Sequence, residues 1–208
     1  MKPKIFQYNN LIIETHPEVY EPSEDTFQLL EALKINEGNS VFEIGTGCGI
    51  IALFCASIGA NVICSDINPY AIETTKKNFQ RNKTKIKGSF KVRKGDLFSV
   101  VKQNEFFDVI IFNPPYLPTK SNEKIGGSGW FDKSVDGGLD GLKTTNKFLN
   151  QIDKFLNKNG RAYFVFSSLS DRKKLEQNIK FNNFTYEVIK SKNYNDETID
   201  IYLIKNSL

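Results

Sequence analysis

The chain has 208 residues, about one and a half times the commonest domain size, so we expect a single domain over residues 1–208. Apolar residues make up 39% of the chain and charged residues 25%, which excludes a disordered tail, a collagen-like repeat and a fibre. The net charge of +4 is too mild to indicate nucleic-acid binding by itself.

Cysteine and histidine are too few here for a disulfide framework or a metal site. Cys48, Cys55 and Cys64 lie in apolar surroundings and never in a Cys-x-x-Cys spacing, and His16 is the only histidine. The sequence has no run near the roughly 18 apolar residues of a membrane span, and its start lacks the apolar core of a signal peptide. We therefore expect a cytoplasmic protein with no metal and no membrane partner.

Short apolar runs alternate with longer amphipathic ones along the chain, the pattern of βαβ units around a parallel sheet. The sequence predicts a doubly wound α/β fold with a mostly parallel seven-stranded sheet, helices on both faces and a C-terminal antiparallel edge hairpin. The expected strands are residues 40–44, 61–65, 89–93, 107–112, 160–166, 186–189 and 198–204, with a wide connection at 192–197. The expected helices are residues 50–57, one opened by Asn68-Pro69, 142–156 and 171–181.

Two segments lie outside this alternation of strands and helices. Residues 1–35 form an N-terminal segment with a short strand at 11–13 and a helix after Ser23, where simple capping explains the acids Glu24 and Asp25. Residues 113–140 hold three of the seven prolines, five of the 14 glycines and the only tryptophan. Connections are usually only about 4–6 residues long. Since this one follows the most apolar strand, where open α/β sheets bind ligands, we expect a substrate loop.

The first motif with chemistry is Glu-Ile-Gly-Thr-Gly-Cys-Gly, residues 43–49, at the end of the first central strand. Its alternating glycines let the backbone turn tightly and let a ligand approach the main chain. The dinucleotide fingerprint requires a sixth-position glycine, and here that position is Ile50. The spacing therefore favours an adenosine-containing ligand without a pyrophosphate.

Two aspartates follow the next strands. Asp66 can accept hydrogen bonds from both hydroxyls of a ribose, the role of an acid about 20 residues past a glycine-rich turn. The alternative is a helix cap, a duty for which Asn68 is better placed. Asp96 can accept from an adenine amine while Leu97 or Phe98 packs on the ring, although Gly-Asp is also a common turn.

The sharpest motif is Asn113-Pro114-Pro115-Tyr116, directly after an apolar strand. Two prolines stiffen the backbone, so the side-chain oxygen of Asn113 and the carbonyl of Pro114 can point at one place and grip both hydrogens of a planar –NH2 group. Tyr116 can cover a flat face of the same group. The plain alternative is that Asn-Pro starts a turn.

Together these motifs resemble those of class I S-adenosylmethionine-dependent amino-methyltransferases. Residues 20–26 (Tyr-Glu-Pro-Ser-Glu-Asp-Thr), 66–69 and 136–141 narrow the resemblance to the HemK-like protein-glutamine methyltransferases of archaeal and eukaryotic type. These enzymes modify the glutamine in the Gly-Gly-Gln motif of class I release factors. The resemblance covers about residues 19–160 and implies a Rossmann-like class I methyltransferase fold. Ser23 departs from the alanine that family members often have.

The resemblance also implies the site and its partners. S-adenosyl-L-methionine is the implied cofactor, and Asn113, Pro114 and Tyr116 hold the acceptor. The implied partners are a class I release factor as substrate and a small zinc-binding activator protein, while nucleic acid is neither required nor excluded. The residues implied to line the cofactor pocket are Thr26, Glu43, Gly45, Asp66, Asp96, Leu97 and Asn113.

Two rival functions remain open from the sequence. An exocyclic amine of adenine or guanine in DNA or RNA offers the same pair of donors as a glutamine amide, and a silent cofactor-binding adapter needs no acceptor. Residues 76–94 carry nine Lys or Arg and no acid. This basic stretch is a solvated helix face with a lysine-guarded edge strand, or a contact surface for RNA-bound or protein partners.

Overall fold

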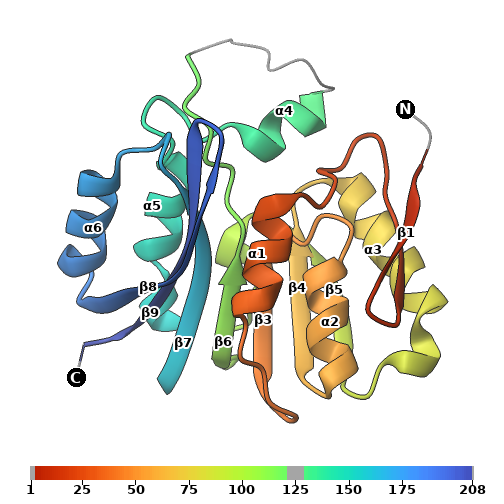
Figure 1. Cartoon of the computed structure of the whole chain (residues 1–208). Helices are drawn as coiled ribbons and strands as arrows, with labels where there is room; N and C mark the ends of the chain where they lie inside the picture. Colours follow the sequence, from red (N-terminus) through yellow and green to blue (C-terminus); the bar gives the residue numbers. More distant parts are fainter. Residues whose placement is uncertain (1–2, 121–128, 208) are drawn as a thin grey trace.

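The computed structural model describes residues 3–120 and 129–207, with a seven-stranded sheet at its centre (Figure 1). The strand order is β5-β4-β3-β6-β7-β9-β8. The first five of these are parallel, and β9 runs antiparallel to both of its neighbours, so the predicted fold class is confirmed. The strands are β3 (Ser40–Ile44), β4 (Asn61–Asp66), β5 (Phe90–Lys94), β6 (Phe107–Phe112), β7 (Leu156–Ser167), β8 (Phe184–Tyr194) and β9 (Glu197–Asn206).

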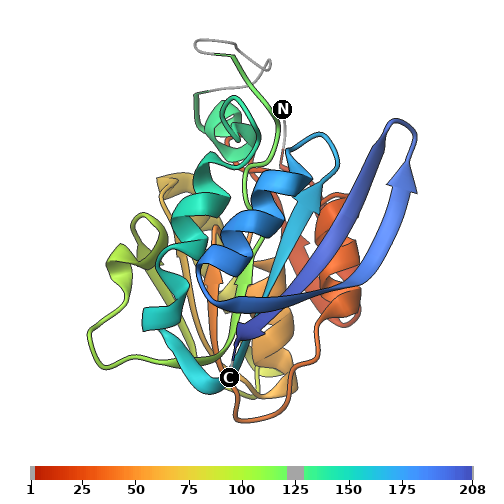
Figure 2. The same ribbon diagram turned by 90° about the vertical axis from the view of Figure 1, so that its left-hand side faces the viewer.

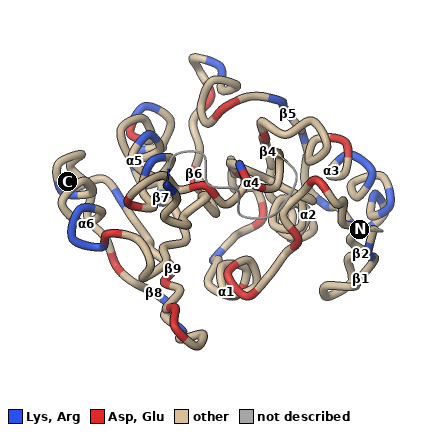
Figure 3. The backbone as a smooth tube through the Cα atoms, turned by 90° about the horizontal axis from the view of Figure 1, so that it is seen from above, with Lys and Arg blue, Asp and Glu red and all other residues tan. Residues whose placement is uncertain are grey.

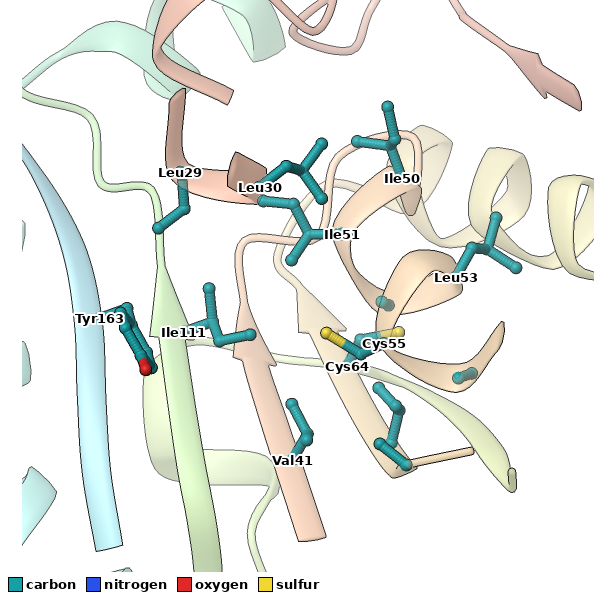
Figure 4. Packing of buried hydrophobic residues seen from close by; sticks show 14 of the residues in the cluster. Leu29, Leu30, Val41, Ile50, Ile51, Leu53, Cys55, Cys64, Ile111 and Tyr163 are labelled. Carbon is teal, nitrogen blue, oxygen red and sulfur yellow. The ribbon is translucent and has the colours of Figure 1, made fainter. Parts of the chain in front are cut away.

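The central strands are buried on both faces. In β6 the side chains alternate between two hydrophobic clusters, Val109 and Ile111 in the first and Ile110 and Phe112 in the second. The first cluster, shown in part in Figure 4, joins the sheet to α1 and α2, and the second joins it to α5 and α6 on the other side (Figure 2). Because helices cover both faces, these strands read as continuous apolar runs. The helices are α1 (Glu24–Ala32), α2 (Ile50–Ile58), α3 (Pro69–Arg81), α4 (Gly129–Val135), α5 (Lys143–Leu149) and α6 (Arg172–Phe181).

A separate antiparallel hairpin, β1 (Ile5–Tyr8) and β2 (Leu11–Glu14), packs beside α3. The side-chain amides of Asn78 and Asn82 bond the backbone of β2 in both directions. Their Oδ1 atoms accept N–H groups at 2.9 Å, and their Nδ2 atoms donate to carbonyls. The sequence predicted only the strand at 11–13 and missed β1, because Ile5–Tyr8 is partly exposed and lacks the unbroken apolar run of residues 11–13.

The C-terminal hairpin is longer than predicted. Its strands extend through the residues assigned to a wide connection, which leaves Asn195 and Asp196 as a tight two-residue turn. Asn195 takes the left-handed conformation, with φ 48°, that such turns require. The predicted edge hairpin is confirmed, but its predicted strands were too short, because polar residues on the exposed positions of β8 hide its strand character.

The predicted helix over 142–156 was also wrong in its second half. The helix α5 ends at Leu149, a single turn follows at Ile152–Lys154, and β7 begins at Leu156. Leu156 is buried and pairs with Phe107 ahead of an irregularity in the register of β6 and β7. That long-range pairing adds four residues to the front of the strand predicted at 160–166.

The basic stretch 76–94 covers the end of α3 and the edge strand β5 (Figure 3). Three of its charges pair with acids of the same chain, namely Lys77 with Glu73, Arg81 with Glu14, and Arg93 with Glu105. The position of β5 at the edge of the sheet favours the interpretation of a lysine-guarded edge. Within residues 3–120 and 129–207, no helix is long and apolar enough to cross a membrane.

Candidate functional site

A pocket of about 940 Å³ opens at the carboxyl ends of β3, β4 and β6. The chain builds β4 and β5 on one side of β3 and then β6 and β7 on the other, so the pocket lies where the winding direction reverses, the usual ligand position in such sheets. The structure brings every predicted site residue to this pocket: Thr26, Glu43, Gly45, Asp66, Asp96, Leu97, Asn113, Pro114 and Tyr116.

The loop after β3 depends on its glycines. Gly45, Gly47 and Gly49 have φ values of 69°, 57° and 84°, a region that side chains disfavour. A Cβ on Gly49 would also come within 2.8 Å of the Thr75 side chain on α3. The backbone of this loop can therefore line the pocket directly, as the motif predicted.

Asp66 ties this loop to the start of α3. Its Oδ2 accepts the N–H of Gly47 at 2.9 Å, and its Oδ1 accepts the N–H of Asn68 at 2.8 Å. Burial raises the pKa of its carboxyl. The cap of α3 is Asn68, whose Oδ1 accepts the N–H of Tyr70 at 2.9 Å, so Asp66 is not needed for that duty.

Glu43 lies beneath the loop with only 2% of its surface exposed. Burial raises its pKa to about 8, and the charge of Asp66 adds to the shift. The hydroxyl of Thr46 donates to Glu43 Oε2 at 2.6 Å. Glu43 thus supports the loop from below, in or near its protonated form at neutral pH.

In the turn after β5, the structure separates the two candidates for packing on the adenine ring. Leu97 lines the pocket in a left-handed conformation with φ 45°, a strained state for leucine that tends to mark functional positions. Phe98 instead stacks on Phe155 in the core, at 4.8 Å between ring centroids. Leu97 is therefore the pocket residue, and Phe98 holds the segment in place.

The Asn-Pro-Pro-Tyr motif meets the N-terminal helix at one carboxylate. Asn113 Nδ2 donates to Asp25 Oδ2 at 2.9 Å, and the hydroxyl of Tyr116 donates to the same oxygen at 3.2 Å. Asn113 Oδ1 is buried and has no partner among the described residues. The hydroxyl of Tyr20 also donates to Asp25, at 3.2 Å. Two segments of the predicted motif set thus converge on Asp25.

Asp25 is a site residue that the sequence does not reveal, since simple capping explains an acid in a first helical turn. The structure gives no side-chain cap at Ser23 and buries Asp25 to 4% exposure. Its Oδ1 accepts both the N–H and the hydroxyl of Thr26, so the polar groups of this implied pocket residue are engaged by Asp25. The helical period could have revealed that Asp25 is buried. It precedes the buried Leu29 by one turn, so the two side chains lie on the same buried face of the helix.

The substrate loop is partly helical. It contains α4, whose Trp130 and Lys133 line the pocket, with Lys133 Nζ 4.5 Å from the centre of the Trp130 ring. The rest of the described loop supports the motif: Leu117 and Asp136 form a parallel bridge, and a Cβ on Gly137 would meet the backbone of Tyr116 at 2.7 Å. Trp130 thus lines the pocket, whereas Gly137 packs against the backbone of the motif. Residues 121–128 of the expected loop lie outside the described part of the chain.

Residues 10–127, more than half of the chain, match the model of the methyltransferase small domain family. The chain belongs to this family. It is 39% identical over 185 residues to a protein named protein N5-glutamine methyltransferase in Methanocaldococcus jannaschii, covering 88% of this chain and 90% of that protein. It is 31% identical over 175 residues to the eRF1 methyltransferase catalytic subunit of Schizosaccharomyces pombe, covering 76% of each. These relatives confirm the resemblance seen in the motifs.

A solved structure shows that the methyltransferase fold is shared. The Mtq2–Trm112 complex of E. cuniculi, described as responsible for methylation of the eRF1 translation termination factor, matches 91% of this chain and 99% of that chain. The TM-score is 0.69 at 23% sequence identity.

The chemistry that this methyltransferase pocket allows rests on orientation rather than on a strong base. Cys48 lines the pocket, but burial raises the pKa of its thiol to about 12, so it stays protonated. His16 stacks on Tyr70 at 4.9 Å, and its Nδ1 accepts the N–H of Glu18. Burial and the charge of Asp25 raise the pKa values of Tyr20 and Tyr116, which therefore remain donors.

Proposed function

We propose that this protein transfers a methyl group from S-adenosylmethionine to the side-chain amide nitrogen of a glutamine, in the Gly-Gly-Gln motif of a class I release factor. The observation that carries the proposal is Asn113 Oδ1, a buried acceptor at the end of β6 that has no partner among the described residues. An unsatisfied buried acceptor is costly, so its retention in a pocket indicates a donor that arrives with a bound molecule. The names of the relatives support the same acceptor.

The residues along the carboxyl ends of β3 and β4 fit S-adenosylmethionine. The glycine loop offers backbone to its amino-acid part, Asp66 offers a carboxylate to the ribose hydroxyls, and Asp96 with Leu97 suits the adenine. Acidic side chains outnumber basic ones among the lining residues, which suits a cofactor that carries a positive sulfur. When bound, this cofactor supplies an electrophilic methyl group on that sulfur.

Asn113 and Pro114 then hold the acceptor. An amide nitrogen is a poor nucleophile because its lone pair is delocalised into the carbonyl. Two hydrogen bonds from its N–H groups, to Asn113 Oδ1 and the Pro114 carbonyl, align the remaining lone pair with the methyl group. Such alignment can account for up to about 7–11 kcal/mol of a barrier. The nitrogen gains the methyl, the sulfur keeps the electron pair of the broken bond, and one N–H proton then leaves to solvent.

Transfer of labelled methyl from S-adenosylmethionine to a purified release factor tests this function. We expect label in the wild-type factor and none in a variant whose Gly-Gly-Gln glutamine is replaced by alanine. Label that persists in that variant would overturn the glutamine assignment. DNA and RNA oligonucleotides serve as competing acceptors, so label in adenine or guanine would establish the nucleobase rival, and binding without transfer to any acceptor would establish the adapter.

We also propose a small activator protein as partner, by analogy with the complex of the E. cuniculi relative. That this activator binds zinc stays a prediction, as does a single catalytic domain over residues 1–208. Full activity of a soluble, purified monomer would contradict the need for an activator. A cytoplasmic location is proposed too, supported by three cysteines that are all free and buried.

A further inference from the structure

We propose that Asp25 is a positioning residue that sets the orientation of the Asn113 side-chain amide, so that oxygen and not nitrogen faces the acceptor. This inference rests on the proposed function and adds to it a residue that lies 88 positions earlier in the chain. Its argument starts from the symmetry of the asparagine side chain.

The amide group of asparagine has two orientations that differ by a half turn. Its oxygen and nitrogen are nearly the same size, and the terminal torsion is broad and roughly two-fold, so asparagine itself selects neither. If Asn113 presented its –NH2 to the acceptor, two donors would face each other, and the grip on the glutamine amide would be lost. Some neighbouring group has to break this symmetry.

The carboxylate of Asp25 selects one of the two orientations of the Asn113 amide. An ionised carboxylate only accepts hydrogen bonds, so the atom that lies 2.9 Å from Asp25 Oδ2 has to be the nitrogen of Asn113. The oxygen of the amide is then turned to the opposite side, where it is buried and has no partner among the described residues. The free acceptor that carries the proposed function is therefore a direct consequence of the contact with Asp25.

Asp25 is itself held by donors alone. Its carboxylate accepts from the hydroxyls of Tyr20 and Tyr116 and from the N–H and hydroxyl of Thr26, and it is 4% exposed. A set made up only of donors fits the ionised form. The partners come from three places in the chain, so the carboxylate cannot rotate away from Asn113 without losing several bonds at once.

The contact also acts on the reaction. A carboxylate that accepts from one end of an amide polarises it and makes the oxygen at the other end a stronger acceptor. The nitrogen of the substrate amide becomes positive as the methyl arrives. The hydrogen bond from its N–H to Asn113 Oδ1 therefore strengthens most in the transition state. Loss of Asp25 should therefore lower kcat more than it raises the KM for the protein substrate.

The test is the variant Asp25→Asn, compared with the charge-swapped pair Asp25→Asn/Asn113→Asp. In the single variant the N–H of Thr26 keeps the oxygen of the new amide, so its –NH2 faces position 113 and turns the Asn113 oxygen away from the acceptor. We expect kcat to fall about a hundredfold, with S-adenosylmethionine affinity within about twofold of wild type. In the swapped pair the carboxylate at 113 accepts from the –NH2 at 25 and still offers an oxygen to the acceptor. We expect it to recover about tenfold or more over the single variant.

The matched control is Glu31→Gln, which removes one negative charge from the same helix but lies exposed, outside the pocket, and pairs with Lys190. It should leave kcat unchanged. An Asp25→Asn enzyme with wild-type kcat, or a swapped pair no faster than the single variant, would overturn the proposal. Equal losses in both Asp25→Asn and Glu31→Gln would show that the charge of the helix is the cause.

A second measurement needs no turnover, so it separates this inference from the proposed function. In the ¹⁵N-labelled protein, the side-chain –NH2 signals of Asn113, identified by their loss in Asn113→Ala, should be downfield and protected from exchange. Asp25→Asn should shift them upfield and remove the protection, and unchanged signals would overturn the inference. Absence of methyl transfer by the wild-type protein, with these signals as expected, would overturn the function alone.

Discussion

Asp66 Oδ2 accepts the backbone N–H of Gly47 at 2.9 Å, so the acid at the end of β4 and the glycine loop after β3 form one unit. The second oxygen of Asp66 accepts from Asn68 at the start of α3. The remaining acceptor capacity of this carboxylate is directed to the pocket that both segments line. Position 66 therefore both shapes the loop and offers a charge to a ligand.

We predict that Asp66→Ala weakens the binding of S-adenosylmethionine. Each hydrogen bond from a ribose hydroxyl to the carboxylate contributes about 1.5–3 kcal/mol, so a loss of tenfold or more is expected. Isothermal titration calorimetry measures it, and circular dichroism checks the fold. Asp66→Asn is the control for the loop, since it keeps one acceptor for Gly47. Unchanged affinity in a folded Asp66→Ala protein would remove Asp66 from the site.

The buried Glu43 should make stability depend on pH. Burial raises its pKa from 4.5 to about 8, so between these values the folded protein holds a proton that the unfolded chain has released. Folding stability therefore falls as pH rises through this window, by at most about 1.4 kcal/mol per pH unit, and levels off above it. Glu43→Gln removes this dependence. In thermal melts, the stability of the variant relative to wild type should rise from about pH 5 to pH 8. A constant difference in stability over this range would mean that Glu43 is ionised in the folded protein.

Trp130 should contribute to protein-substrate binding and not to cofactor binding. It lies on α4, past the Asn-Pro-Pro-Tyr motif, and lines the pocket with Lys133 against its ring. We predict that Trp130→Ala raises the KM for the release factor about tenfold or more, since a buried aromatic anchor commonly contributes at least 1.4 kcal/mol to an interface. Affinity for S-adenosylmethionine should stay within about twofold in calorimetry. Equal losses of release-factor binding and of cofactor affinity would show that α4 instead maintains the structure of the pocket.

Gly137 should be required for the position of Tyr116. A Cβ there would lie 2.7 Å from backbone atoms of both Tyr116 and Gly141, which cannot move away cheaply. We predict that Gly137→Ala lowers the free energy of unfolding by about 1–3 kcal/mol and reduces kcat, because Tyr116 contacts Asp25. Denaturant titration and steady-state rates test this. Gly138→Ala is a poor control because φ is 74° there, so the exposed Gly129 serves instead.

The sequence was sufficient for the parallel part of the sheet and for the motif residues. The strands β3 and β6 are buried on both faces, which makes them continuous apolar runs, and the ligand-facing residues follow directly after each strand end. Parallel strands bring such ends to one edge of the sheet. The meeting of residues from five separate motifs in one pocket could therefore be predicted without knowing any distance between them.

The sequence was insufficient where long-range contacts decide the structure. The front of β7 is a strand because it pairs with β6, and the polar positions of β8 gave no period to read. Asp25 looked like one of two ordinary helix-capping acids, because its role depends on Asn113 and Tyr116, which lie far along the chain. A local pattern carries no information about such a partner.

The last prediction separates binding from chemistry at Asn113. Asn113→Ala removes one of two acceptors for the substrate amide and leaves the buried Asp25 without one donor. Misalignment at a transfer centre can cost about a hundredfold in rate. We predict that this variant folds, binds S-adenosylmethionine slightly more weakly than wild type, and loses most single-turnover transfer to glutamine at saturating cofactor.

Asn113→Asp is the more telling variant because it is nearly isosteric and still accepts hydrogen bonds. From the sequence alone, its added charge could attract the positive sulfur and tighten cofactor binding. The structure places that charge against Asp25, at the 2.9 Å that now separates Asp25 Oδ2 from the Asn113 nitrogen. Two carboxylates at such a distance share a proton, which raises one of the two pKa values and leaves the local charge near its wild-type value. We therefore expect cofactor affinity within about threefold of wild type and a loss of transfer at least as large as in Asn113→Ala. Quenched-flow assays with labelled methyl measure both variants. A wild-type rate in either one would reduce Asn113 to a turn residue and remove the main support for transfer to an amide nitrogen.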